Sequence, residues 1–171
     1  MFSCKKNACA DAEVKVIMLS STQLQKVHYK GNDTVTCMID SDTITLLSNA
    51  KRQYFNTVSD GKTCEGINKK LEGYEILLKD SSSSHTLYHN QNRSFITDSA
   101  FVITVTYNTV SFEITEAKLN SAFYTKPDLM VNGKLYHHVY LGANVNNDSL
   151  YYSLDIGVIR FKTQGHILQV L

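Results

Sequence analysis

The chain has 171 residues, 43% of them apolar, and a formal net charge of +1, values that fit one globular domain with a sizeable core. Lys and Arg nowhere form a run longer than two residues, so the sequence offers nucleic acid no basic surface and predicts no nucleic-acid partner. No apolar run reaches the roughly 18 residues that a membrane-spanning helix needs.

The N-terminal residues predict a lipid-anchored tether. The chain opens with Met1-Phe2-Ser3-Cys4-Lys5-Lys6, and a small residue before a Cys resembles the end of a bacterial lipoprotein signal. On this interpretation Met1 replaces a removed signal peptide and Cys4 is the lipidation site. Residues 1–13 then form a flexible tether to a single β-rich domain, residues 14–171. The alternative is an ordinary N-terminus with an incidental Cys.

Strands are predicted in the first part of the domain. Residues 14–19 and 24–29 have β-type composition, and residues 34–39 and 43–47 flank the polar turn Asp40-Ser41-Asp42. Two such runs on either side of a short polar turn are typical of a β-hairpin.

The middle of the chain supports two interpretations. Residues 51–58 favour a short strand. Apolar residues recur at helical spacing over residues 67–78, which predicts a helix, although Gly73 within it costs about 1 kcal/mol relative to Ala. A strand over residues 74–78 is the competing prediction.

The clearest pattern lies after residue 100. Residues 101–107 and 110–114 alternate apolar and polar side chains around Asn108-Thr109, which predicts a hairpin with one dry and one wet face. Residues 116–123 are expected to form a short, partly helical connector, and three β-type runs close the chain. The whole pattern predicts a mainly β fold, either an antiparallel sandwich or an open, curved half-barrel, with at most one or two short helices.

The cysteines permit disulfides and have no metal-ligand spacing. Cys4, Cys9, Cys37 and Cys64 contain no C-x-x-C pair, and four cysteines allow three pairings. In an oxidising compartment we expect Cys37 to pair with Cys64. The alternative is that Cys37 is a buried free thiol.

No catalytic or cofactor motif stands out. His85 and His89 are four residues apart, but the zincin Glu and a clear third ligand are missing, so they are weak metal candidates and no metal is predicted. A hydrolase site would have to use scattered residues such as His85, His89 and Asp98, since the G-x-S-x-G motif is absent. Gly-rich phosphate loops are absent too, and no cofactor is predicted.

Tyrosines are dense in the C-terminal third. Exposed tyrosines can form a platform for a glycan or a partner protein, whereas half-buried strands also favour Tyr for packing alone. The candidates for a binding face are Tyr124, Tyr136, Tyr140, Tyr151 and Tyr152.

The closing segment carries a family resemblance. Tyr151-Tyr152-Ser153 and then Ile156-Gly157-Val158-Ile159-Arg160-Phe161, preceded by Asn-Gly-Lys-x-Tyr at residues 132–136, resemble the ending of uncharacterised Bacteroidetes cell-envelope lipoproteins. The resemblance implies an envelope location and a β-rich fold, and it implies no activity. Packing explains the motif physically: Ile156, Val158 and Phe161 are core candidates, and Gly157 relaxes the backbone at a turn.

These features together predict a lipid-anchored binding or interaction domain of the cell envelope without catalytic activity, either an outer-membrane lipoprotein or a periplasmic protein. Its expected partners are the membrane, through the anchor, and a protein, a glycan or a hydrophobic ligand. The alternative is a periplasmic carrier that holds a hydrophobic ligand inside a half-barrel, and a hydrolase ranks third. A deep apolar cavity would distinguish the carrier from the binding domain.

Overall fold

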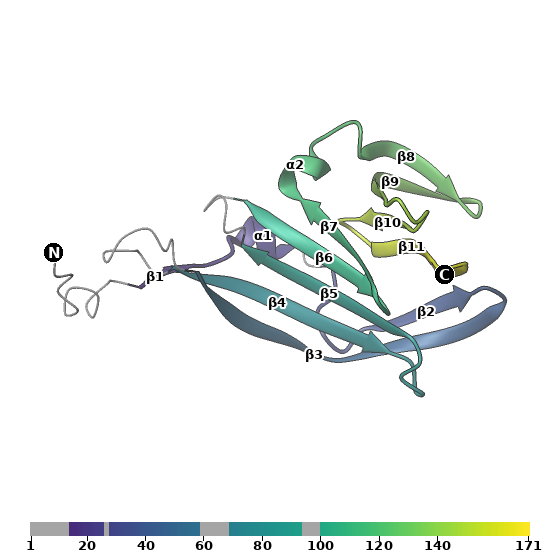
Figure 1. Cartoon of the computed structure of the whole chain (residues 1–171), viewed down its shortest axis with the longest axis horizontal. Coiled ribbons are helices and arrows are strands. Elements are labelled where there is room, and N and C mark those ends of the chain that lie inside the picture. The colour runs from purple at the N-terminus through teal and green to yellow at the C-terminus, as the bar shows by residue number, and fades with distance from the viewer. Residues whose placement is uncertain (1–13, 26–27, 59–68, 94–99) are drawn as a thin grey trace, which may run out of the picture.

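The computed structural model describes residues 14–25, 28–58, 69–93 and 100–171, which form a mainly β fold with two short helices (Figure 1). In chain order the elements are β1 (Lys15–Ile17), α1 (Ser21–Gln25), β2 (Thr34–Ile39), β3 (Asp42–Val58), β4 (Lys69–Lys79), β5 (Thr86–Arg93), β6 (Phe101–Tyr107), β7 (Val110–Thr115), α2 (Glu116–Leu119), β8 (Thr125–Val131), β9 (Lys134–Ala143), β10 (Ser149–Ser153), β11 (Gly157–Thr163) and β12 (His166–Val170).

The strands form one sheet built from two meanders. Strands β2 to β7 follow one another, β8 to β12 do the same, and β12 pairs with β2, which gives the order β7-β6-β5-β4-β3-β2-β12-β11-β10-β9-β8. All of these pairs are antiparallel. Short β1 adds in parallel to the start of β4. The result is an open, curled half-barrel, one of the two predicted architectures.

The sheet curls because its two edge strands are consecutive in the chain. Residues 116–124, which include α2, join β7 to β8. A flat sheet of eleven strands would place its edges about 48 Å apart, at about 4.8 Å per strand. Nine residues span at most about 30 Å. The connection therefore requires the edges to approach each other, and the predicted helical connector is confirmed in α2, which is capped by the Thr115 hydroxyl.

An aromatic core fills the inner side of this curl. The ring of Phe161 in β11 lies 5.4 Å from that of Phe112 in β7 and 5.6 Å from that of Tyr107 in β6, although β11 is far from both strands in the sheet order. Alternate residues of each strand point inward and supply the core. Its other fully buried members include Leu46, Ile76, Leu78, Leu87, Phe101, Ile103, Ile114, Leu150 and Val158.

The N-terminal segment crosses the inner side and is held there by a buried carboxylate. The backbone N–H of Leu19 donates to Glu72 in β4 at 2.6 Å. The same carboxylate accepts hydrogen bonds from the Gln53 side chain at 2.6 Å and from the Tyr74 hydroxyl at 2.8 Å. A buried carboxylate is stable only when it is paired in this way, so Glu72 fixes the path of the segment.

One histidine and two tyrosines are buried together on the inner side of the sheet. His89 in β5 and Tyr152 in β10 share a hydrogen bond of 2.9 Å. Tyr29 places its ring edge-on to His89, with 5.3 Å between the ring centroids, and accepts a hydrogen bond from the Val158 N–H at 3.1 Å. Burial lowers the pKa of His89 to about 3, because the surrounding core disfavours the charged imidazolium.

We expect His89 to make the fold acid-sensitive. In the unfolded chain His has a pKa of about 6.5. Its folded pKa is lower, so the unfolded state binds the proton first. Stability is therefore complete above pH 6.5 and falls as the pH drops toward 3, by about tenfold in the folded-to-unfolded ratio per pH unit. Urea unfolding between pH 7.5 and pH 4 should show this dependence in the wild type and a weaker one in His89→Gln, where His28, whose pKa is also lowered by burial, still contributes.

Exposed His138 supplies the control for that experiment. The variant His138→Gln should keep the wild-type dependence of unfolding free energy on pH. Parallel pH profiles for wild type and His89→Gln would show that His89 is not the group responsible.

Two predictions of secondary structure are wrong. A helix is expected over residues 67–78, but residues 69–78 lie in β4, where Leu77 points outward and the inward positions are Tyr74, Ile76 and Leu78. A strand is expected over residues 24–29, but residues 24 and 25 belong to α1 and residues 28 and 29 lie in no strand. The Ser20 hydroxyl accepts from the Gln23 N–H as the N-cap of α1.

The other predicted elements are present. The competing prediction, a strand over residues 74–78, is correct, but β4 is longer than predicted and spans Lys69–Lys79. The hairpins β2–β3 and β6–β7 are confirmed, and residues 51–58 form the second half of β3. In the closing meander Val158 and Phe161 are buried, whereas Ile156 is half-buried against a second cluster. Gly157 has a positive φ of 85°.

Candidate binding surface

The outer face of β3, β4 and β5 carries a polar groove of ≈ 530 Å³. The strand register creates it. Arg52 of β3 lies opposite Glu75 of β4, and Glu75 lies opposite Asn90 of β5. Gly73 of β4 likewise lies opposite Tyr54 of β3 on one side and opposite Asn92 of β5 on the other. Because these positions share one face of the sheet, their side chains meet across three strands.

A β-bulge decides which residues of β3 reach this groove. Before the bulge Ser48 is buried and Leu47 points outward, so odd-numbered positions face solvent. The register shifts between Ser48 and Lys51. One extra residue reverses the alternation, and after it Arg52 and Tyr54 face outward.

Hydrogen bonds link the groove side chains into a fixed network. The Tyr88 hydroxyl donates to Glu75 at 2.7 Å and accepts from the Asn90 amide nitrogen at 2.9 Å. The Asn90 amide oxygen accepts from the Tyr54 hydroxyl at 2.7 Å and from the Asn92 amide at 3.1 Å. Side chains held in this way on paired strands are pre-organised for recognition.

The charges in the groove are balanced. Arg52 forms an ion pair with Glu75, with 3.0 Å between Nη1 and Oε1, and the Arg52 side chain is 75% exposed. An exposed pair of this kind contributes little to stability, up to about 1 kcal/mol. Burial raises the pKa of Tyr88, which keeps this phenol neutral and able to donate.

The Tyr54 ring packs over Gly73 of β4. A Cβ atom added at Gly73 would overlap the Cζ atom of Tyr54 and lie 2.6 Å from its hydroxyl oxygen. The absence of a side chain at Gly73 therefore lets the Tyr54 ring lie against the backbone of β4. Tyr54 also lines the groove.

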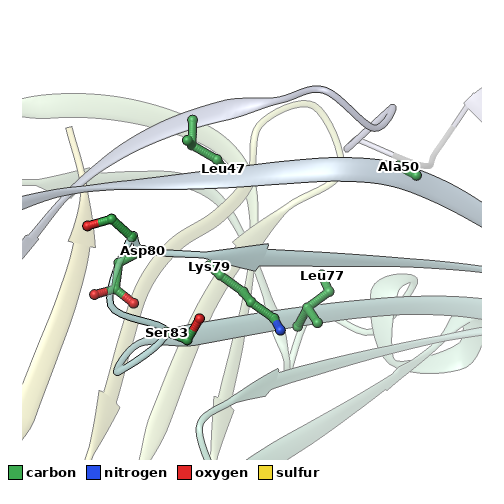
Figure 2. A pocket seen from close by; sticks show the side chains of 7 residues that line it. Leu47, Ala50, Leu77, Lys79, Asp80 and Ser83 are labelled. Atoms are coloured by element: carbon green, nitrogen blue, oxygen red, sulfur yellow. The ribbon is translucent and has the colours of Figure 1, made fainter.

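An apolar pocket of ≈ 410 Å³ continues the groove along the same face (Figure 2). Leu47, Ala50 and Leu77 form its floor, and Lys79 and Asp80 lie at its rim. We call the groove and the pocket together the outer strip, defined by Arg52, Tyr54, Glu75, Tyr88, Asn90, Asn92, Leu47 and Leu77. A polar half and an apolar half thus adjoin on one rigid surface.

The five tyrosines predicted as a binding face do not share an exposed face. Tyr136, Tyr140 and Tyr152 are buried, with 4%, 2% and 0% exposure. Tyr124 stacks on Tyr140 beside the main core, whereas Tyr151 packs against a second cluster with Tyr136. Their rings fill the space on both sides of the C-terminal strands, because half-buried strands use Tyr for packing.

The two suspected histidines have separate partners. His85 Nδ1 lies 2.9 Å from the Tyr107 hydroxyl, and His89 is buried against Tyr152. Asp98 lies outside the described residues. Within the described part of the chain, no three His, Cys, Asp or Glu side chains are grouped so that they could hold a metal ion.

Of the four cysteines, the structure describes Cys37. Its sulfur is fully buried, and burial raises the pKa of the Cys37 thiol to about 12. Cys4, Cys9 and Cys64 lie outside the described residues, so lipidation at Cys4 and the pairing of Cys37 with Cys64 stay predictions.

The sequence holds one signal for the groove that composition alone did not reveal. Residues 88–92 read Tyr-His-Asn-Gln-Asn, and Asn is depleted in strands. Amide side chains at alternate positions of a strand indicate that its outer face has a use beyond packing.

Comparisons with protein families, with curated proteins and with solved structures find no match to this chain. The two helices of the described residues have five and four residues, and neither is long enough to cross a membrane.

Proposed function

We propose that this chain is a lipid-anchored, non-catalytic binding domain of the cell envelope and that the outer strip is its binding surface. The observation that carries the proposal is the network of Tyr54, Tyr88 and Asn90 beside an open apolar pocket. Side chains that are already fixed by hydrogen bonds lose little conformational freedom when a ligand binds.

The anchor is supported by the sequence around Cys4 and by the resemblance of the closing segment. The fold adds a geometric argument. Lys15 of β1 lies opposite Lys69, so the chain enters the domain at the start of β4. The outer strip runs along β4 toward Lys79, which lies about 33 Å from Lys69 at about 3.3 Å per residue. β1 lies at one end of β4 (Figure 1), so a tether there would hold the far end of the strip away from the membrane.

The carrier alternative has less support. Its ligand would occupy the inner side of the curled sheet, and fully buried Phe161, Tyr107 and Tyr152 fill that side. The groove and the pocket described above lie on the outer face.

The first part of the test concerns the anchor. In cells that make the complete gene product, we expect an alkyne-labelled fatty acid to be incorporated and the protein to fractionate with membranes. Cys4→Ala should abolish the label and release the protein, whereas Cys9→Ala should change neither. Label retained by Cys4→Ala would contradict the anchor.

The second part of the test concerns the outer strip. Full-length Cys4→Ala protein should sediment saturably with isolated cell envelopes. Adding Arg52→Ala and Tyr54→Ala should weaken this binding by about tenfold or more, since both remove contacts from the groove. Phe123→Ala, which alters an aromatic side chain that is 81% exposed outside the strip, should have no effect. Equal sedimentation of all variants would rule out the strip as the binding surface.

A further inference from the structure

We propose that the polar groove of the outer strip binds a neutral glycan chain, with Tyr54 as the ring on which a sugar stacks. The inference rests on the proposed function and names the ligand class of the same surface. Four properties of the groove lead to it: a floor formed by the paired strands β4 and β5, balanced charge, a ring that lies against the sheet, and neighbouring amides.

The floor of the groove is largely made of paired strands. β4 and β5 are paired on both sides along the groove, whereas residues 51–58 of β3 are paired with β4 alone in the described part of the chain. A peptide that binds by adding a strand needs a free sheet edge. A ligand that lies across β4 and β5 must therefore be recognised by side chains.

The charge of the groove fits a neutral ligand. In the described part of the chain, the charged residues that line it are Arg52 and Glu75, which form an ion pair with each other. Phosphate-bearing or acidic ligands are held by clusters of unpaired cations, and the groove has no such cluster among the described residues. Polar recognition without net charge favours hydroxyl-bearing ligands.

Tyr54 has the geometry of a stacking platform. Its ring lies against the backbone at Gly73, and its hydroxyl is held by Asn90 at 2.7 Å and by Asn92 at 3.4 Å. The ring therefore keeps its orientation without a ligand. The π face of an aromatic ring carries partial negative charge, which attracts the partly positive C–H groups on the flat face of a sugar.

The amides complete the complementarity. Asn90 and Asn92 lie side by side, joined by a hydrogen bond of 3.1 Å. The hydrogen bonds among the described residues leave one N–H of Asn90 and the amide oxygen of Asn92 for a ligand. Each sugar hydroxyl both donates and accepts, so these two groups can meet neighbouring hydroxyls. Arg52 has five N–H donors, and its contact with Glu75 leaves others for the ligand.

The test is titration calorimetry of the full chain with four neutral oligosaccharides: cellohexaose, xylohexaose, mannohexaose and chitohexaose, each at up to about 5 mM. We expect at least one to bind. Tyr54→Ala should weaken that binding by about tenfold or more, and Tyr54→Phe, which keeps the ring, should weaken it less. Phe123→Ala should bind as wild type does. Hexagalacturonate, an acidic chain, should bind no more tightly than the neutral chains.

Tyr54→Ala also removes the ring that packs over Gly73, which could destabilise the sheet, so circular dichroism must show that this variant is folded. Arg52→Ala is the second probe because its side chain is mostly exposed, and we expect it to weaken binding several-fold without loss of fold. Binding by none of the four oligosaccharides, or binding that neither variant changes, overturns the inference. If Tyr54→Ala lowers envelope sedimentation while no oligosaccharide binds, the proposed function stands and the glycan assignment fails.

Discussion

Phe161→Ala should lower the free energy of unfolding by about 3–5 kcal/mol, the loss expected when a buried Phe is truncated to Ala. Phe161 is completely buried, and its ring contacts Phe112 of β7 and Tyr107 of β6. These strands lie on the far side of the curled sheet from β11. The truncation therefore leaves a cavity where the two meanders face each other, at a contact that holds the curled sheet together.

Urea unfolding followed by circular dichroism measures this loss. Domains of this kind have a total stability of about 5–15 kcal/mol, so the variant should unfold at much lower urea or fail to fold. Phe123→Ala is the matched control, because Phe123 is 81% exposed and its truncation should cost less than about 0.5 kcal/mol. Similar losses for the two variants would mean that the Phe161 contacts do not hold the meanders together.

Gly157→Ala should destabilise the protein more than the backbone conformation alone explains. Gly157 has a φ of 85°, and an Ala in the left-handed region costs about 1–2 kcal/mol. A Cβ at this position would also lie 2.7 Å from the Tyr29 hydroxyl oxygen and 2.8 Å from Cδ2 of His28. Tyr29 would have to move, which would leave the Val158 N–H without its hydrogen bond and cost about 1–3 kcal/mol more.

Gly133→Ala separates the two contributions. Gly133 has a similar φ of 78°, and a Cβ there would meet no heavy atom of the described residues within 4 Å. It should show the backbone cost alone, about 1–2 kcal/mol, against about 2–5 kcal/mol for Gly157→Ala in the same urea experiment. Equal losses would show that the contact with Tyr29 adapts at no cost.

The sequence predicted the local strand structure where side-chain alternation was clear. Residues 101–107 and 110–114 became β6 and β7, because a hairpin is defined by near neighbours and one turn. The pattern failed over residues 67–78. There the outward Leu77 and the inward, hydrogen-bonded Glu72 replace the regular alternation of apolar and polar residues. Whether such a residue faces inward depends on its contacts with β3 and with the N-terminal segment, which are distant in the sequence.

The candidate site could not be located from the sequence. The outer strip combines residues of β3, β4 and β5, and its composition depends on the bulge between Ser48 and Lys51. Without that one-residue shift, Lys51 and Gln53 would face outward in place of Arg52 and Tyr54. The tyrosines that the sequence did single out lie mainly in the core, because Tyr suits both an exposed platform and a half-buried strand.

The sequence by itself determined the mainly β class, two hairpins, the helical connector and the buried positions of Val158 and Phe161. These features follow from side-chain periodicity and turn residues, which act over a few positions. Only the tertiary structure decided how far the sheet curls, which polar groups are buried and which side chains form the outer strip. Those properties depend on strand register and on contacts between residues far apart in the chain, such as Phe112 with Phe161, and local sequence patterns carry no information about such contacts.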